Sequence, residues 1–254
     1  MITEKVATKP EINIFPTRED MGIAAARSAG KKIQDLLKSQ PEVNVIFAAA
    51  PSQNEFLVQL QLQDIDWSRV NAFHMDEYIG LDKEAPQGFG NFLRDRIFGK
   101  QAFKAVYYLD GNAADIEAEC QRYAALLAQY PTDVVCMGIG ENGHIAFNDP
   151  PVADFNDPHL VKVVELEAAC RQQQVNDGCF DYIDEVPTHA LTLTVPALVQ
   201  PQAIFCVVPG PAKATAVYNT LNQPVVEAYP STILREHNNC QLYLDADSAK
   251  LLKQ

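Results

Sequence analysis

Apolar runs of strand length alternate along the chain with segments of helical periodicity. The first run, residues 11–15, predicts a strand, and Thr17 follows it as the predicted N-cap of a helix with Asp20 three residues on. The run 43–50 is almost continuously apolar, which is typical of a strand buried on both faces. Further strands are predicted at 70–74, 105–109, 133–137, 161–166, 190–193, 203–208 and 241–244, and further helices at 52–62, 113–129 and 212–221.

This alternation predicts an α/β fold, with a doubly wound, largely parallel sheet and helices on both faces. No internal repeat or low-complexity linker divides the sequence, so we expect a single domain over residues 1–254. In such folds, ligands bind beyond the carboxyl ends of the strands. Functional residues are therefore expected after positions 50, 74, 137 and 208.

Composition narrows the class of protein. Hydrophobic residues make up 47% of the chain, enough for a sizeable core, and the net charge of −13 leaves no basic face for nucleic acid. No run of about 18 apolar residues predicts a membrane span, and residues 1–5 lack the basic start of a secretory signal. The six cysteines show no CxxC pattern and no Cys/His ligand cluster, so we interpret them as reduced thiols in the cytoplasm.

Two adjacent carboxylates, Asp76 and Glu77, follow the strand predicted at 70–74. Neighbouring carboxylates repel each other and are costly to bury. One interpretation is structural, with an ion pair or a cap for the next element. The other is catalytic, because partial burial raises the pKa of a carboxyl group into the range of a general base.

A glycine-rich segment, residues 137–150, follows the strand predicted at 133–137. Its glycines match GxGxxG by position, but prolines at 150 and 151 prevent the helix that a dinucleotide fingerprint requires. We therefore expect Gly140 and Gly143 to let the backbone approach a ligand closely. His144 supplies a titrating imidazole in the same segment, and Asp149 supplies a carboxylate able to orient it.

The stretches MDEYIGL, from position 75, and GIGENGHIAFNDP, from position 138, resemble the two signature segments of the glucosamine-6-phosphate deaminase family. The order of predicted strands fits that family over nearly the whole chain. The related 6-phosphogluconolactonases share the fold and a similar Gly-His loop. Their acidic motif is typically Asp-Glu-Arg and their loop usually ends in a Ser-Leu-Phe-Pro type sequence. The Glu77-Tyr78 pair and the Ala-Phe-Asn stretch at 146–148 are more similar to the deaminases.

The resemblance implies a role for each matching position. Asp76 stands at the position of the base that moves a proton between C1 and C2 of the open-chain sugar. His144 matches the histidine that opens the pyranose ring, and Asp149 takes the place of the glutamate that supports it. Glu77, Gly140 and Gly143 then line the substrate site. The implied chemistry requires no metal and no organic cofactor.

Three positions depart from the family pattern. Asn142 replaces the usual aspartate two residues before the histidine, so it can hydrogen-bond but supplies no charge. Asp149 is one methylene shorter than the usual glutamate. The phosphate loop, usually Thr-Gly-Gly-Thr-Pro, is here APSQNE, where Ser52 and Glu55 form a capping-box pattern. The same helix N-terminus can offer backbone N–H groups to a phosphate, with side chains of Ser52, Gln53 and Asn54 as additional donors.

Two cations are candidates for holding the substrate phosphate. Lys213 matches a phosphate-binding lysine of the family, and a lysine at a helix start is unfavourable unless an anion compensates. The family arginine has no clean match, and we expect Arg171 to take its role.

The interpretation that combines these features is an amino-sugar-phosphate deaminase and isomerase whose partner is a phosphorylated amino sugar. A 6-phosphogluconolactonase and a non-catalytic sugar-phosphate sensor on the same fold are the alternatives. The glucosamine or galactosamine configuration stays open. Because hexamers are common in the family, a homo-oligomer also stays open.

Overall fold

The computed structural model of the protein describes residues 10–252. Its main sheet has seven parallel strands in the order β1-β10-β9-β6-β2-β3-β5. From β2 the chain continues to β3 on one side, while β6 lies on the other side, so a topological switch point falls between β2 and β6. The strands are β1 (Glu11–Phe15), β2 (Val43–Phe47), β3 (Val70–His74), β5 (Ala105–Tyr107), β6 (Val134–Met137), β9 (Ala203–Val208) and β10 (Cys240–Asp245).

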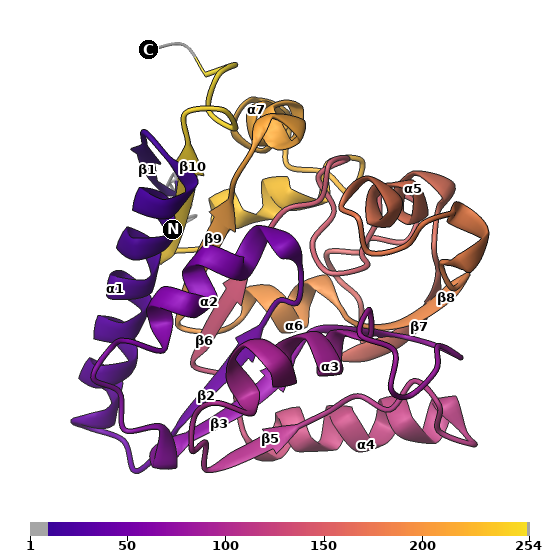
Figure 1. The fold of residues 1–254 in the computed structure, drawn as a ribbon, viewed down its shortest axis with the longest axis horizontal. Helices are drawn as coiled ribbons and strands as arrows, with labels where there is room; N and C mark the ends of the chain where they lie inside the picture. Colours follow the sequence, from indigo (N-terminus) through magenta and orange to yellow (C-terminus); the bar gives the residue numbers. More distant parts are fainter. Residues whose placement is uncertain (1–9, 253–254) are drawn as a thin grey trace, which may run out of the picture.

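Helices cover both faces of this sheet, which confirms the predicted doubly wound architecture (Figure 1). Residues of α1, α2 and α3 share one apolar cluster with the sheet, and residues of α4, α6 and α7 share the other. The short helix α5 lies at the far end of the molecule from α1. The helices are α1 (Arg18–Leu37), α2 (Asn54–Leu60), α3 (Phe89–Leu93), α4 (Ile116–Gln129), α5 (Ala168–Asn176), α6 (Val195–Val199) and α7 (Ala214–Asn222).

The strand β2 shows how one sequence supplies both layers of the core. Its side chains alternate in direction, so Val45 and Phe47 belong to the cluster under α1 and α2, whereas Ile46 belongs to the opposite cluster. All of its residues are buried. The continuous apolar run that predicted a strand covered on both faces is therefore explained.

Two predicted strands lie outside the main sheet. β7 (Val161–Glu165) and β8 (His189–Leu193) pair antiparallel with each other, and β8 also pairs antiparallel with β4 (Asp76–Tyr78). We call these three strands the small sheet. The sequence pattern predicts no strand at β4, because its three residues are too few to show an alternation.

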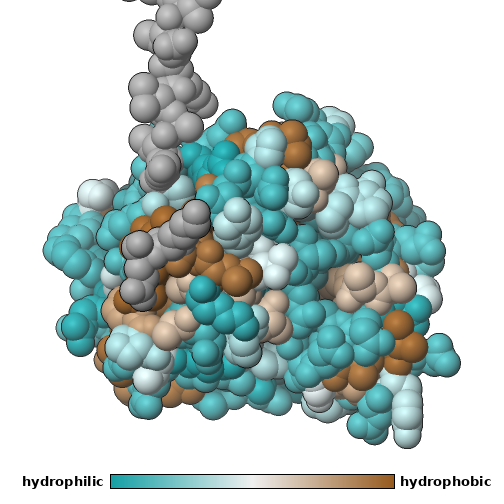
Figure 2. Space-filling view, turned by 90° about the horizontal axis from the view of Figure 1, so that it is seen from above, coloured by the Kyte–Doolittle hydropathy of each residue, from teal (hydrophilic) through white to brown (hydrophobic). Residues whose placement is uncertain are grey.

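The first helix begins as predicted. The Thr17 side chain accepts a hydrogen bond from the backbone N–H of Asp20 at 3.1 Å, and α1 follows directly. Within residues 10–252, no helix is long and apolar enough to cross a membrane. Residues 1–5, which carried the prediction about a secretory signal, lie outside the described residues. Seen from above, the surface is mostly hydrophilic, with apolar residues in small groups (Figure 2).

Candidate active site

The corner between β3 and β4 directs Asp76 toward the carboxyl end of the main sheet. His74 closes this corner, since its Nδ1 lies 2.9 Å from the backbone oxygen of Asp76 and its Nε2 accepts a hydrogen bond from Leu109 N. Burial lowers the pKa of His74 to about 4, so the ring is neutral and Nδ1 donates. The Tyr123 hydroxyl of α4 bonds to the backbone of His74 as both donor and acceptor. The backbone on which Asp76 sits is therefore fixed from two elements.

The carboxyl group of Asp76 has the properties that a general base requires. The residue is 7% exposed, and no hydrogen bond to its carboxylate is found within residues 10–252. Burial raises the pKa of Asp76 well above its ordinary value, and the charge of Glu77 raises it further. A carboxylate without a partner, in such an environment, is ready to accept a proton from a bound molecule.

Asp76 lines a pocket between β2, β6 and α5, at the switch point of the sheet. The pocket measures about 60 Å³, less than the roughly 300–1,000 Å³ of most small-molecule sites. A small-molecule ligand would therefore extend beyond this pocket or displace some of its walls. Besides Asp76, its walls are Ala48, Ala49, Ala50, Ser52, Gln53, Met75, Phe89, Gly138, Ile139, Gly140, His144, Ala146, Phe147 and Gln174.

The loop after β6 carries His144 into this pocket. A Cβ atom at Gly140 would lie 2.2 Å from the His144 ring, so only glycine leaves room for it. Gly143 has φ +89°, which favours glycine, and Ala146 has φ 49°, an uncommon backbone conformation for alanine. No helix lies between residues 138 and 160, so the segment is not a dinucleotide fingerprint.

His144, Asp149 and Asn142 form one buried polar group. His144 Nδ1 lies 3.0 Å from Asp149 Oδ1, and Asn142 Nδ2 donates to the same oxygen at 2.8 Å. The Asn142 carbonyl accepts a hydrogen bond from the backbone N–H of His144 at 3.0 Å. Burial acts to raise the pKa of Asp149, but the interactions with His144 and Asn142 outweigh it and hold that pKa below its ordinary value. Asp149 is therefore an anion beside the imidazole.

Glu77 points away from this group, so the structure separates the two adjacent carboxylates. Its oxygens accept hydrogen bonds from the backbone N–H groups of Tyr78, Phe89 and Gly90 at 2.8–3.0 Å. Two of these donors belong to the first turn of α3. Burial raises the pKa of Glu77, while the three donors act in the opposite direction. Glu77 is not among the residues that line the pocket of Asp76 and His144.

The segment predicted to hold phosphate is split between two environments. Ser52 and Gln53 line the pocket, and Gln53 Nε2 donates to Val207 O at 3.1 Å. Asn54 faces away, because its Oδ1 accepts a hydrogen bond from Arg96 at 2.6 Å. The capping box predicted for this helix is absent, since Glu55 instead forms an ion pair with Arg18 at 3.0 Å.

Of the two predicted cations, Lys213 is the one whose charge interacts with the loop of His144, although it is not among the residues that line the pocket. It is 6% exposed, and burial lowers its pKa against the attraction of Asp177 and Glu141. Glu141 belongs to the same loop as His144. The guanidinium of Arg171, in contrast, donates to the carbonyl oxygens of Ile183 and Val186. The predicted phosphate role of Arg171 therefore has no geometric support.

Two residues of the site were missed by the sequence analysis. Gln174 is 8% exposed and lines the pocket from α5. Cys170, one turn earlier on the same helix, is 1% exposed and lies beside His144 and Asp149. The one available signal was helical spacing, because residues four apart share a face. That signal becomes informative only when the position of α5 over the pocket is known.

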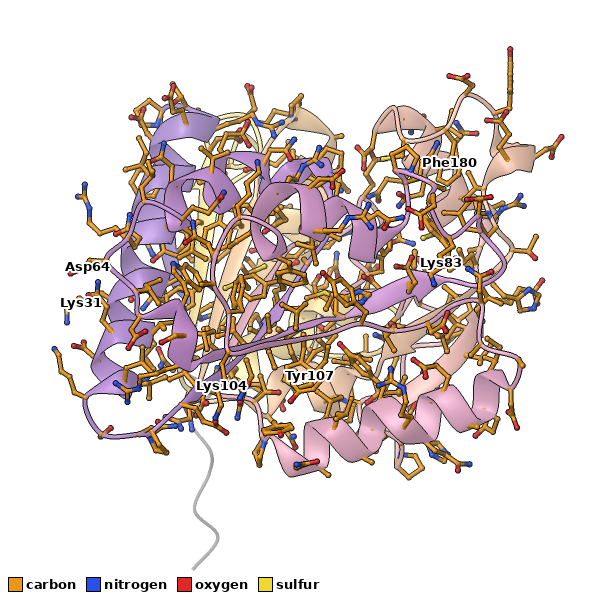
Figure 3. The ribbon with its side chains drawn as sticks, turned by 60° about the horizontal axis from the view of Figure 1, so that its bottom comes forward. Lys31, Asp64, Lys83, Lys104, Tyr107 and Phe180 are labelled. Atoms are coloured by element: carbon orange, nitrogen blue, oxygen red, sulfur yellow. The ribbon has the colours of Figure 1, made fainter. Side chains whose placement is uncertain are left out.

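A second cavity lies on the other side of β4. It measures about 370 Å³ and is lined in part by Glu77, Lys83, Arg94, Tyr108 and Asp110. Figure 3 labels Lys83, which lines this cavity, and Phe180, whose ring packs 5.7 Å from that of Tyr78 at the same end of the molecule. The strand β4 therefore separates a small pocket that contains Asp76 from a larger cavity that contains Glu77.

Comparison with known proteins identifies the family of the chain. Residues 16–243 match the family described as glucosamine-6-phosphate isomerases/6-phosphogluconolactonase. A glucosamine-6-phosphate deaminase from Bacillus cytotoxicus is 32% identical over 229 residues, 90% of this chain and 86% of its own. One from Streptococcus sanguinis is 34% identical over 227 residues, 88% and 94% of the two chains.

Solved structures give the same result for the fold. A monomeric glucosamine-6-phosphate deaminase superposes with a TM-score of 0.86 at 28% identity, covering 95% of this chain and 99% of its own. A 6-phosphogluconolactonase from Shewanella baltica has a TM-score of 0.79 at 18% identity, covering 94% and 99%. The family match spans both signature segments and the main sheet except β1 (Glu11–Phe15) and the last two residues of β10 (Cys240–Asp245). The chain therefore belongs to the family of glucosamine-6-phosphate isomerases and 6-phosphogluconolactonases.

Proposed function

We propose that the protein is an enzyme that isomerises and deaminates an amino-sugar 6-phosphate, giving a ketose 6-phosphate and ammonia. The observation that carries this proposal is the unbonded, buried carboxylate of Asp76, which faces His144 across one pocket. The relatives that are 32–34% identical are named glucosamine-6-phosphate deaminase. Two separate proton donors or acceptors in one pocket suit a reaction with both ring opening and isomerisation.

His144 serves the first step, which opens the pyranose ring. A proton must reach the ring oxygen while the hydroxyl proton at C1 is removed, and an imidazole can exchange both near neutral pH. The anionic Asp149 lies 3.0 Å from the His144 ring, where it can orient the imidazole, and the side-chain amide of Asn142 donates a hydrogen bond to the same carboxylate oxygen. The product of this step is the open-chain aldehyde, with the amino group on C2.

Asp76 serves the second step. With the C2 amino group as an ammonium, Asp76 removes the proton from C2 while one ammonium proton passes to O1, which gives an enolamine. Asp76 then returns its proton to C1, which gives a protonated imine at C2. Addition of one water molecule to C2 and loss of ammonium then leave the ketone, so every atom and charge of substrate and water is accounted for. Because one carboxylate acts on two adjacent carbons, it must have no fixed hydrogen bond of its own, as is found for Asp76.

The substrate phosphate is proposed to bind at the N-terminal end of α2. Ser52 and Gln53 line the pocket there, and the amides at a helix start favour an anion. Lys213 is proposed as the counter-charge, because a buried lysine whose pKa is lowered gains most from a nearby anion. Asn54 and Arg171 are left out, since their polar atoms already have protein partners.

Two alternatives remain distinct in their chemistry. A 6-phosphogluconolactonase adds water to an ester carbonyl and requires no base that acts on two carbons. A non-catalytic sensor requires no base at all, so the presence of both Asp76 and His144 in one pocket favours an enzyme. A cytoplasmic location is part of the proposal, since all six cysteines carry free thiols.

The test is an assay of ammonia release from a panel of 6-phosphorylated hexosamines that includes the glucosamine and galactosamine forms. The same preparation is assayed for hydrolysis of 6-phosphogluconolactone. We expect ammonia and ketose phosphate in equal amounts from one of the amino sugars, and no lactone hydrolysis above the spontaneous rate. Hydrolysis of the lactone without ammonia release would replace this proposal with the hydrolase. Binding of sugar phosphate without either reaction would favour the sensor.

A further inference from the structure

Three side chains that can bind a transition metal meet beneath the pocket. One ligand atom from each of His144, Asp149 and Cys170 lies within 4.8 Å of the other two. Their exposed fractions are 7%, 0% and 1%. The sequence analysis found no Cys/His cluster, because these residues are separated along the chain. The fold creates the cluster by placing α5 against the loop that follows β6.

Two of the possible metal-ligand atoms in this cluster lack a hydrogen-bond partner. Within residues 10–252, neither His144 Nδ1 nor Asp149 Oδ2 has a hydrogen bond of good geometry, and the weak S–H donor of Cys170 is the nearby group that interacts with the Asp149 carboxylate. The 3.0 Å contact between Nδ1 and Asp149 Oδ1 is close, but its geometry is not that of a hydrogen bond. Buried polar atoms almost always have a partner, and each exception requires an explanation such as a bound ion.

The three donors fit one class of ion. Bonds of 2.0–2.3 Å in a tetrahedral zinc site place its ligand atoms roughly 3.3–3.8 Å apart. In the cluster, His144 Nδ1 and Asp149 Oδ1 lie 3.0 Å apart, and no two of the three ligand atoms are more than 4.8 Å apart. Small side-chain rotations therefore bring the three atoms into range. A mixed set of nitrogen, oxygen and sulfur favours Zn²⁺ over Mg²⁺ or Ca²⁺, which prefer oxygen. The two charges of the ion balance one thiolate and one carboxylate.

We propose that His144, Asp149 and Cys170 form an inhibitory Zn²⁺ site, with a fourth position open toward the pocket. On binding, the Cys170 thiol loses its proton to solvent and the sulfur, the imidazole nitrogen and a carboxylate oxygen bind the ion. His144 and Asp149 can then no longer exchange a proton with the sugar ring. Metal binding is independent of the proposed function, whereas inhibition rests on it.

Cobalt provides the direct test, because Co²⁺ takes the place of Zn²⁺ and gives a charge-transfer absorption band when a thiolate binds it. The full-length protein is titrated with Co²⁺ beside Cys170→Ser and Cys179→Ser. Cys179 follows α5, the helix that carries Cys170, but lies outside the cluster, so its variant is the matched control. We expect one Co²⁺ per chain with the band in the wild-type and control proteins, and no band in Cys170→Ser.

Absence of the band from the wild-type protein, or its survival in Cys170→Ser, overturns the site. If Cys170→Ser does not fold, Asp149→Asn decides by the same titration, with Co²⁺ affinity expected to fall by roughly tenfold or more. Inhibition is measured separately as ammonia release with Zn²⁺ and after its removal by a chelator. A cobalt band without zinc inhibition keeps the site but overturns its inhibitory role. An inactive protein with the band overturns the proposed function alone.

Discussion

The two cavities on either side of β4 differ in size and in chemistry. Size favours one of them as a ligand site, and the state of the carboxylate favours the other. The cavity beside Glu77 is the larger, at about 370 Å³ against about 60 Å³ beside Asp76. Yet the Glu77 carboxylate already accepts three backbone hydrogen bonds, whereas none is found for that of Asp76 within residues 10–252. A carboxylate with all its partners stabilises a fold, and one without them is available for chemistry.

This contrast also explains why two adjacent acids can be buried together. Successive side chains of a strand point to opposite sides, so β4 directs Asp76 toward His144 and Glu77 toward α3. Their charges still interact, and that of Glu77 raises the pKa of Asp76. Glu77 therefore binds the first turn of α3 and, through its charge, raises the pKa of Asp76. Between these two cavities, volume favours the side of Glu77, whereas the free carboxylate favours the side of Asp76.

The largest expected effect is that of Asp76→Asn. Loss of a proton-transfer base typically lowers the rate by about 10²–10⁴, while binding of the sugar phosphate should remain. The raised pKa of Asp76 means that its charged form costs stability, increasingly as pH rises from the ordinary carboxyl value to the raised one. Asparagine removes this cost, so the Tm at neutral pH should stay equal or rise. Turnover of Asp76→Asn near the wild-type rate would show that Asp76 is not the base.

Lys213→Ala should produce the next largest effect. A charge-assisted hydrogen bond to phosphate contributes about 1.5–3 kcal/mol, so the KM for the phosphorylated sugar should rise by roughly one to two decades. Lys83→Ala is the matched control, because Lys83 lines the cavity on the opposite side of β4. Its KM should not change. Calorimetry that finds a larger loss of affinity in Lys83→Ala would move the phosphate to the larger cavity.

Glu77→Gln should act on stability more than on chemistry. The amide group replaces one accepting oxygen, which leaves at least one buried backbone N–H of Tyr78, Phe89 or Gly90 unpaired. We expect the free energy of unfolding in urea to fall by about 1–3 kcal/mol. The turnover number at the pH of maximal activity should change by much less than in Asp76→Asn. A variant as stable as wild type but inactive would make Glu77 the catalytic group.

The smallest expected effect is a shift of the pH profile that arises from the interaction between the charges of Asp76 and Glu77. Asp76 must be deprotonated to act, so kcat/KM should fall as pH is lowered through its raised pKa. Glu77→Gln removes a negative charge that raises this pKa, so the acidic limb of the profile should move to lower pH. The pKa of Asp149 is lowered, so Asp149 does not produce this limb. A limb that does not move would indicate that the two charges are uncoupled.

The main sheet could be predicted from sequence because its strands are continuous apolar runs between amphipathic helices. In the small sheet the strands β7 and β8 could be predicted, but β4 could not, since it has three residues and pairs with β8, which is distant in sequence. Asp76, His144 and Asp149 stand in local motifs, so sequence places them together after two strand ends. Their actual geometry, including the split between Asp76 and Glu77, follows from the direction of each side chain.

The positions that were misjudged share a physical reason. Asn54 and Arg171 have the right chemistry for phosphate, but Arg96 bonds the first and backbone carbonyls bond the second. Gln174 and Cys170 were missed because their proximity to the pocket depends on how α5 packs. Residue type predicts what a side chain can bind, but only the tertiary structure determines which partner it actually contacts.

The small sheet has a consequence for how new substrate preferences could arise. Residues 166–188, which include α5, lie between two strands of one antiparallel pair, β7 and β8. Their replacement by a segment from a relative need not disturb any strand of the main sheet. Such an exchange would replace Gln174 in the wall of the pocket together with Gln173, which accepts a hydrogen bond from Glu141 in the loop of His144. A chimera at these two junctions therefore changes the pocket wall and a support of the catalytic loop in one step, while the strand that carries Asp76 keeps its sequence.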